Sequence, residues 1–136
     1  MAEAIARSSL ESGKVEGVAD SVFVASAGTS AFDGSPPSPE AVDALTRIGV
    51  SHHGTSKRLT AEMIRRADWV FGMTANHVSR ARELVAGEAA HLAKIVPLDP
   101  RAEIDDPIGM GGAAYDRLGA QFRELIPRRL SEMLSA

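Results

Sequence analysis

Cysteine is absent from the 136 residues of this sequence. Disulfides, thiolate metal sites and thiol nucleophiles are therefore excluded within these residues. The chain has four histidines, and the adjacent pair His52 and His53 has no carboxylate or third histidine nearby at the spacing of a metal site. We accordingly expect no metal ion and no other cofactor.

The sequence also lacks long apolar runs and an excess of basic residues. No stretch approaches the roughly 18 to 20 apolar residues that span a bilayer, and the first residues do not form a signal peptide. The net charge is −3, whereas nucleic-acid binders usually carry a basic excess. These absences argue against membrane and nucleic-acid partners and predict a cytoplasmic domain.

What is present is an alternation of helical and strand patterns. Apolar, β-branched runs predict buried strands at Val22–Ala25, Trp69–Met73 and Ile95–Leu98. Apolar residues at helical spacing, with Ser38, Thr60 and Thr74 in N-cap positions, predict helices over 1–10, 39–48, 61–67, 75–85 and 113–134. Such an order indicates an α/β fold, in which a parallel sheet is covered by helices. No linker is long enough to split the chain, so we expect a single domain over 1–136.

Several short stretches, in order, match one protein family. They are Met1-Ala2-Glu3-Ala4, Ser26-Ala27-Gly28-Thr29, Leu59-Thr60, Met73-Thr74 with His77, and Asp105-Asp106-Pro107 followed by Gly109 and Tyr115. Together they resemble the low-molecular-weight protein tyrosine phosphatases and the related bacterial protein arginine phosphatases. The resemblance covers the whole chain and implies the phosphotyrosine phosphatase I-like fold, a three-layer arrangement with helices on both faces of a parallel sheet.

Members of that family open with a central strand and a loop that contains a Cys, five further residues and an Arg. Neither the strand nor the loop occurs in this sequence. We therefore expect an N-terminally truncated domain, whose natural product begins upstream of Met1. The alternative is a true truncated paralogue that closes the gap by strand sliding or by pairing with another chain.

The resemblance also implies a chemistry. A complete member hydrolyses protein phosphotyrosine or phosphoarginine through a cysteinyl-phosphate, and Asp106 matches its general acid, with Asp105 as the fallback. Ile108 matches a residue on the substrate side, and Phe32 lies in a loop that walls the cleft; the alternative roles are loop anchoring for Ile108 and packing for Phe32. Glycines and Met110 follow the Asp-Pro pair instead of paired aromatic residues, which is closer to the arginine-phosphatase and general bacterial branch.

Whether this chain is an enzyme is left open by the sequence. Without Cys and Arg from the missing loop, we expect the chain as written to be inactive, although a complete form would act on a phosphorylated protein. The alternative function is a non-catalytic pseudophosphatase that binds or regulates through its surface, or as a homo-oligomer. Hydrolysis of p-nitrophenyl phosphate by this chain would separate the two, since no candidate nucleophile is present.

Overall fold

The computed structural model describes residues 1–18, 22–29, 34, 36–51 and 54–135. These residues form two compact units. The helical unit comprises Met1–Ser26, Ser35–Thr55 and Pro107–Ala136, and the sheet unit comprises Ala27–Gly34 and Ser56–Asp106.

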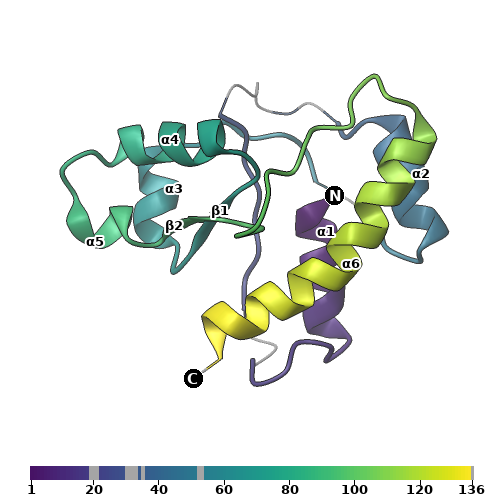
Figure 1. The fold of residues 1–136 in the computed structure, drawn as a ribbon, viewed down its shortest axis with the longest axis horizontal. Coiled ribbons are helices and arrows are strands. Elements are labelled where there is room, and N and C mark those ends of the chain that lie inside the picture. The colour runs from purple at the N-terminus through teal and green to yellow at the C-terminus, as the bar shows by residue number, and fades with distance from the viewer. Residues whose placement is uncertain (19–21, 30–33, 35, 52–53, 136) are drawn as a thin grey trace. The chain divides into compact units, whose positions relative to one another are not determined.

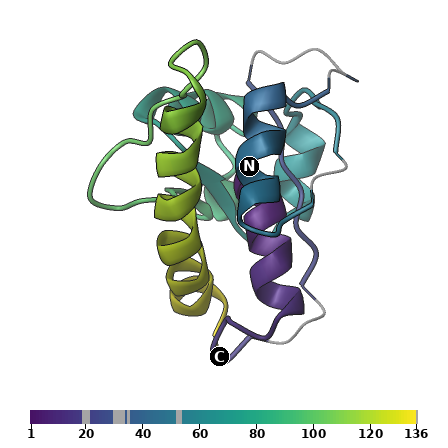
Figure 2. The ribbon, with the colours of Figure 1, turned by 90° about the vertical axis from the view of Figure 1, so that its right-hand side faces the viewer.

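Three helices build the helical unit, namely α1 (Ala2–Glu11), α2 (Pro39–Arg47) and α6 (Gly112–Leu134). Both α1 and α2 pack against α6, and Figure 2 shows the two shorter helices beside the long one. The predicted cap of α2 is confirmed: the Ser38 hydroxyl accepts a hydrogen bond from the Ala41 N–H at 3.3 Å, and Pro39 occupies the first helical position.

The core of the helical unit is apolar and lies along α6. Ile5 from α1, Leu45 from α2 and Phe122 from α6 are all buried. Tyr115 on α6 packs against Ala41 and Ala44 of α2, and Met1 covers the same cluster. At the surface, an ion pair of 2.8 Å between Arg47 and Asp116 also links α2 to α6.

The sheet unit contains a two-stranded sheet and three helices in the part of the chain that the structure describes. Its elements are α3 (Ala61–Arg66), β1 (Val70–Gly72), α4 (Ala75–Leu84), α5 (Ala89–Leu92) and β2 (Ile95–Pro97). The two strands are parallel, with Val70 opposite Ile95 and Gly72 opposite Pro97. The predicted parallel sheet is therefore confirmed for these two strands, and Figure 1 shows α4 running beside them.

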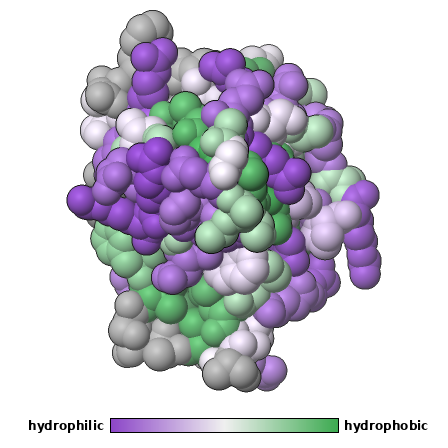
Figure 3. Space-filling view, turned by 90° about the vertical axis from the view of Figure 1, so that its left-hand side faces the viewer, coloured by the Kyte–Doolittle hydropathy of each residue, from purple (hydrophilic) through white to green (hydrophobic). Residues whose placement is uncertain are grey.

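Side chains from three elements form the core of the sheet unit. Ile64 of α3, Ala81 and Val85 at α4, and Ile95 of β2 make one buried cluster. The predicted caps Thr60 and Thr74 are present, and each hydroxyl accepts a backbone N–H three residues on, at 3.2 and 3.3 Å. On the face toward α5, hydrophilic and apolar residues are mixed at the surface (Figure 3).

The predicted strand at Val22–Ala25 is wrong. Residues 22–27 belong to no strand in the described part of the chain, and the Phe23 side chain is 85% exposed. A strand needs a neighbouring backbone to complete its ladder, but here the Val24 carbonyl instead accepts a hydrogen bond from the Arg7 side chain at 2.8 Å. An apolar run alone does not reveal whether such a neighbour exists.

The short helix α5 was not anticipated from the sequence, since its four residues are too few to show a helical period. Among the helices that the structure describes, none has the length and apolarity needed to cross a bilayer.

Candidate functional site

The predicted general acid belongs to the loop that follows β2 in the sheet unit. In parallel sheets, ligands bind where the carboxyl ends of the strands meet. Met73 and Thr74 follow β1, and Leu98 follows β2, at the same end of the sheet. The Leu98 N–H donates to the Gly72 carbonyl at 2.8 Å, which joins the two strand ends.

The loop from Asp99 to Asp106 returns to this end of the sheet and is fastened there. The Ile104 N–H donates to the Met73 carbonyl at 2.9 Å, and the Ile104 side chain is buried. The Glu103 carboxylate accepts the Ala75 N–H at 2.7 Å, at the N-terminus of α4. Asp106 therefore stands two residues beyond a backbone anchor, and its side chain is exposed.

A groove lies between this loop and α4 within the sheet unit. Its volume is about 390 Å³, and it is lined by Met73, Val78 and Pro97 on its apolar side, with Asp99 and Arg101 among its polar residues. Asp106 is not among its lining residues. A ligand in this groove alone would therefore not contact Asp106 through the residues that line it.

The residues after the Asp-Pro pair belong to the helical unit, because the boundary between the units falls between Asp106 and Pro107. The Met110 N–H donates to the Pro107 carbonyl at 3.0 Å and closes a turn. Gly109 has a φ of +76°, a left-handed conformation that glycine adopts without strain. Ile108 and Met110, on this turn, are 70% and 66% exposed.

The three predicted site residues thus have different outcomes. Asp106 and Ile108 are both exposed, on either side of Pro107, whereas Phe32 lies outside the described residues. Their roles stay predictions.

Met110 is exposed like Ile108 and was not among the predicted site residues. The sequence signal that could have identified Met110 is an apolar residue between two glycines. In the described ranges no three His, Asp or Glu side chains gather to hold a metal ion.

Comparison with known proteins places this arrangement in a family. The model of the low molecular weight phosphotyrosine protein phosphatases matches residues 1–135. A search of curated proteins gives no match. Among solved structures, a mutant of the YwlE arginine phosphatase, with a phosphorylated active-site serine in place of cysteine, is 27% identical, with a TM-score of 0.83. The match covers 98% of this chain and 85% of that one.

Two other solved structures are similarly close. The low molecular weight protein tyrosine phosphatase from T. tengcongensis is 28% identical, with a TM-score of 0.80, and the match covers 96% of this chain and 87% of that one. The YwlE arginine phosphatase from Geobacillus stearothermophilus is 28% identical, with a TM-score of 0.76. That match covers 96% of this chain and 82% of the other. The family match over residues 1–135 and these shared folds agree with one another. The chain belongs to the low molecular weight phosphotyrosine protein phosphatase family.

Proposed function

We propose that this domain is the acid-bearing part of a phosphatase, inactive as these 136 residues and active when a Cys- and Arg-containing loop is supplied. The observation that carries the proposal is the pairing of a family match over residues 1–135 with the absence of any cysteine. The YwlE mutant with a phosphorylated serine in place of its active-site cysteine supports a cysteine nucleophile in that relative.

In the completed protein, hydrolysis takes two steps. The thiolate attacks phosphorus, the bond from phosphorus to the leaving oxygen or nitrogen breaks, and the Asp106 carboxyl gives its proton to that atom. The resulting Asp106 carboxylate then takes a proton from water, which attacks phosphorus and releases phosphate from sulfur. The anchoring of the loop through Ile104 and Met73 at 2.9 Å supports this role, because an acid must be held in place to transfer a proton.

For the substrate we propose a protein phosphoarginine or phosphotyrosine. The exposed side chains of Ile108 and Met110 would contact the aliphatic or aromatic part of the phosphorylated residue. The arginine phosphatases among the solved relatives, at 27% and 28% identity, favour phosphoarginine. Phe32 is the other proposed substrate contact.

The test compares three proteins on phosphotyrosine and phosphoarginine peptides and on p-nitrophenyl phosphate. They are the 136-residue chain, the chain preceded by the first strand and catalytic loop of the Bacillus subtilis YwlE, and the same fusion with that loop's Cys replaced by Ser. We expect turnover only from the fusion that keeps the Cys. Turnover by the unextended chain, or a folded fusion without activity, would contradict the proposal.

The absence of cysteine also favours a second candidate, a pseudophosphatase domain that acts by binding. Its signature would be saturable binding of a phosphopeptide by the unextended chain, without hydrolysis. The phosphatase proposal expects such binding to be weak, since the loop that would surround the phosphate oxygens is not among these residues.

A further inference from the structure

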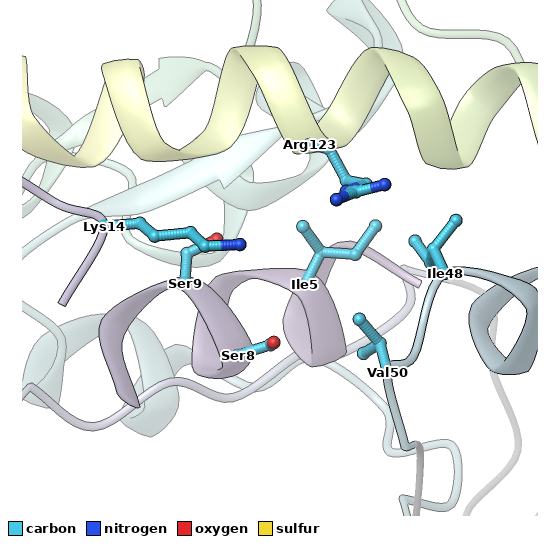
Figure 4. Close-up of a pocket in the computed structure, with 7 residues that line it drawn as sticks. All are labelled: Ile5, Ser8, Ser9, Lys14, Ile48, Val50 and Arg123. Carbon is cyan, nitrogen blue, oxygen red and sulfur yellow. The ribbon is translucent and has the colours of Figure 1, made fainter. Parts of the chain in front are cut away.

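The small cavity in the helical unit, between α1 and α6, has a volume of about 50 Å³. Its two basic side chains, Lys14 and Arg123, are exposed to solvent, and Figure 4 shows the Ile5 side chain between them. Water therefore screens both charges, and the cavity does not require an anion. In the sheet unit, by contrast, a charged side chain of the loop before Asp106 has a specific partner.

This side chain is Glu103, which lies three residues before Asp106 and binds another element of the sheet unit. Its carboxylate accepts the Ala75 N–H at 2.7 Å. Ala75 is the first residue of α4, and the first four N–H groups of an α-helix have no partner within the helix. The helix dipole also favours a carboxylate at this end. The hydrogen bond is therefore charge-assisted, and it joins the loop to α4.

The backbone next to Glu103 forms a second attachment at the same place. The Ile104 N–H donates to the Met73 carbonyl at 2.9 Å, and the Ile104 side chain is buried. Met73 and Ala75 flank Thr74, the N-cap of α4, whose hydroxyl accepts a backbone N–H further along the helix. Two consecutive residues of the loop are thus attached to the two sides of one helix cap.

We propose that Glu103 is a positioning residue that holds the Asp106 carboxyl where it can transfer its proton. This inference rests on the proposed function, in which Asp106 is the general acid. A single attachment, at Ile104, fixes the position of the loop but not its direction, whereas two adjacent attachments fix both. A general acid must stay within hydrogen-bond reach of the leaving atom. Because Glu103 is exposed, water competes for its carboxylate, so we expect a moderate effect and not a complete loss.

The first test uses ¹⁵N relaxation and amide hydrogen exchange in the 136-residue chain. In Glu103→Ala the Ala75 amide should exchange about 10-fold faster, since its acceptor is lost, and the Asp106 amide should gain mobility on the ps–ns timescale. Glu103→Gln should keep the parent values, because its amide oxygen can accept the same N–H. Glu83→Ala is the matched control, because Glu83 lies near the other end of α4 and pairs with Arg80. Unchanged mobility of the Asp106 amide in Glu103→Ala would overturn the proposal.

The second test measures turnover of phenyl phosphate and p-nitrophenyl phosphate by the fusion that carries the Cys-containing loop. Glu103→Ala should lower the turnover of phenyl phosphate about 5- to 50-fold and that of p-nitrophenyl phosphate much less, because the poorer leaving group depends more on the proton. Glu103→Gln and Glu83→Ala should keep the parent ratio of the two rates. A merely structural role of Glu103 would lower both rates alike, and that result would contradict the proposal.

Asp106→Asn in the same fusion separates this inference from the proposed function. A ratio that changes in Asp106→Asn but not in Glu103→Ala would overturn the positioning role alone. An inactive parent fusion, or an unchanged ratio in Asp106→Asn, would overturn the proposed function and the positioning role with it. A ratio that changes in the same direction in both variants is the result that we expect.

Discussion

Gly72, the last residue of β1, lies so close to Val78 of α4 that a Cβ atom on Gly72 would stand 2.7 Å from the Val78 Cγ2 atom. The same Cβ would stand 3.2 Å from the Val78 backbone nitrogen. This close approach places the N-terminus of α4 directly against the end of β1. It therefore helps to position Met73 and the loop that carries Asp106.

Gly72→Ala should destabilise the protein by about 1 to 3 kcal/mol, because the added methyl group overpacks the contact with Val78. Adding Val78→Ala should recover part of that loss, since it removes the clashing Cγ2 atom. Urea unfolding followed by the fluorescence of the single tryptophan, Trp69, would measure both changes.

Gly112→Ala is the control for this prediction. Gly112 is the first residue of α6, and among the described residues no atom outside its chain neighbours and the adjacent backbone of the helix lies within 4 Å of a Cβ at that position. Alanine there should leave stability unchanged or raise it by up to about 1 kcal/mol. Equal effects of the two substitutions would contradict the close contact between Gly72 and Val78.

Ile64 is fully buried in the core of the sheet unit, against Ala81, Val85 and Ile95. Ile64→Ala should lower the free energy of unfolding by about 2 to 5 kcal/mol, through lost burial and the cavity left behind. The neighbouring Met63 is 38% exposed, and Met63→Ala should cost less than about 1 kcal/mol. A loss for Ile64→Ala no larger than that for Met63→Ala would contradict the core assignment.

The α-amino group of Met1 provides a prediction on pH. Burial lowers its pKa from the ordinary value of 8.0, against a smaller opposing effect of Glu3. In the pH range between the lowered folded pKa and 8.0 the unfolded chain binds more protons, so stability should rise as the pH increases through that range. At pH values below the lowered pKa the amine is charged in both states, and the full cost of burying its charge lowers the stability of the fold.

Enzymatic Nα-acetylation of Met1 tests the predicted direction of this pH dependence, because acetylation removes the positive charge of the amine. The acetylated chain should gain stability over the unmodified chain at about pH 6 and lose most of that advantage at about pH 9. Urea midpoints at the two pH values would show it. An advantage of the same size at both would mean that the charge of the amine has no part in the effect.

Local signals in the sequence were sufficient for most of the helices and for two strands. Ser38, Thr60 and Thr74 each accept the backbone hydrogen bond expected of an N-cap, because capping depends on residues only three positions apart. The apolar run at Val22–Ala25 failed as a predictor, since strand formation depends on a distant partner that local sequence does not specify.

The candidate site was less predictable. The Asp-Pro pair directed attention to Asp106 only through the family resemblance, because such pairs are common in turns. The anchoring of its loop, by Ile104 on Met73 and by Glu103 on the N-terminus of α4, has no local signature.

The most direct test of the central claim, that Asp106 is the proton donor of a phosphatase, uses the fusion that carries a Cys-containing loop. Turnover of phenyl phosphate should fall about 10²- to 10⁴-fold in Asp106→Asn, because its leaving group needs the proton. Turnover of p-nitrophenyl phosphate should fall less, because its leaving anion is more stable, and Asp105→Asn should keep the parent rates. Unchanged turnover of both substrates in Asp106→Asn, or the loss appearing in Asp105→Asn instead, would contradict the claim.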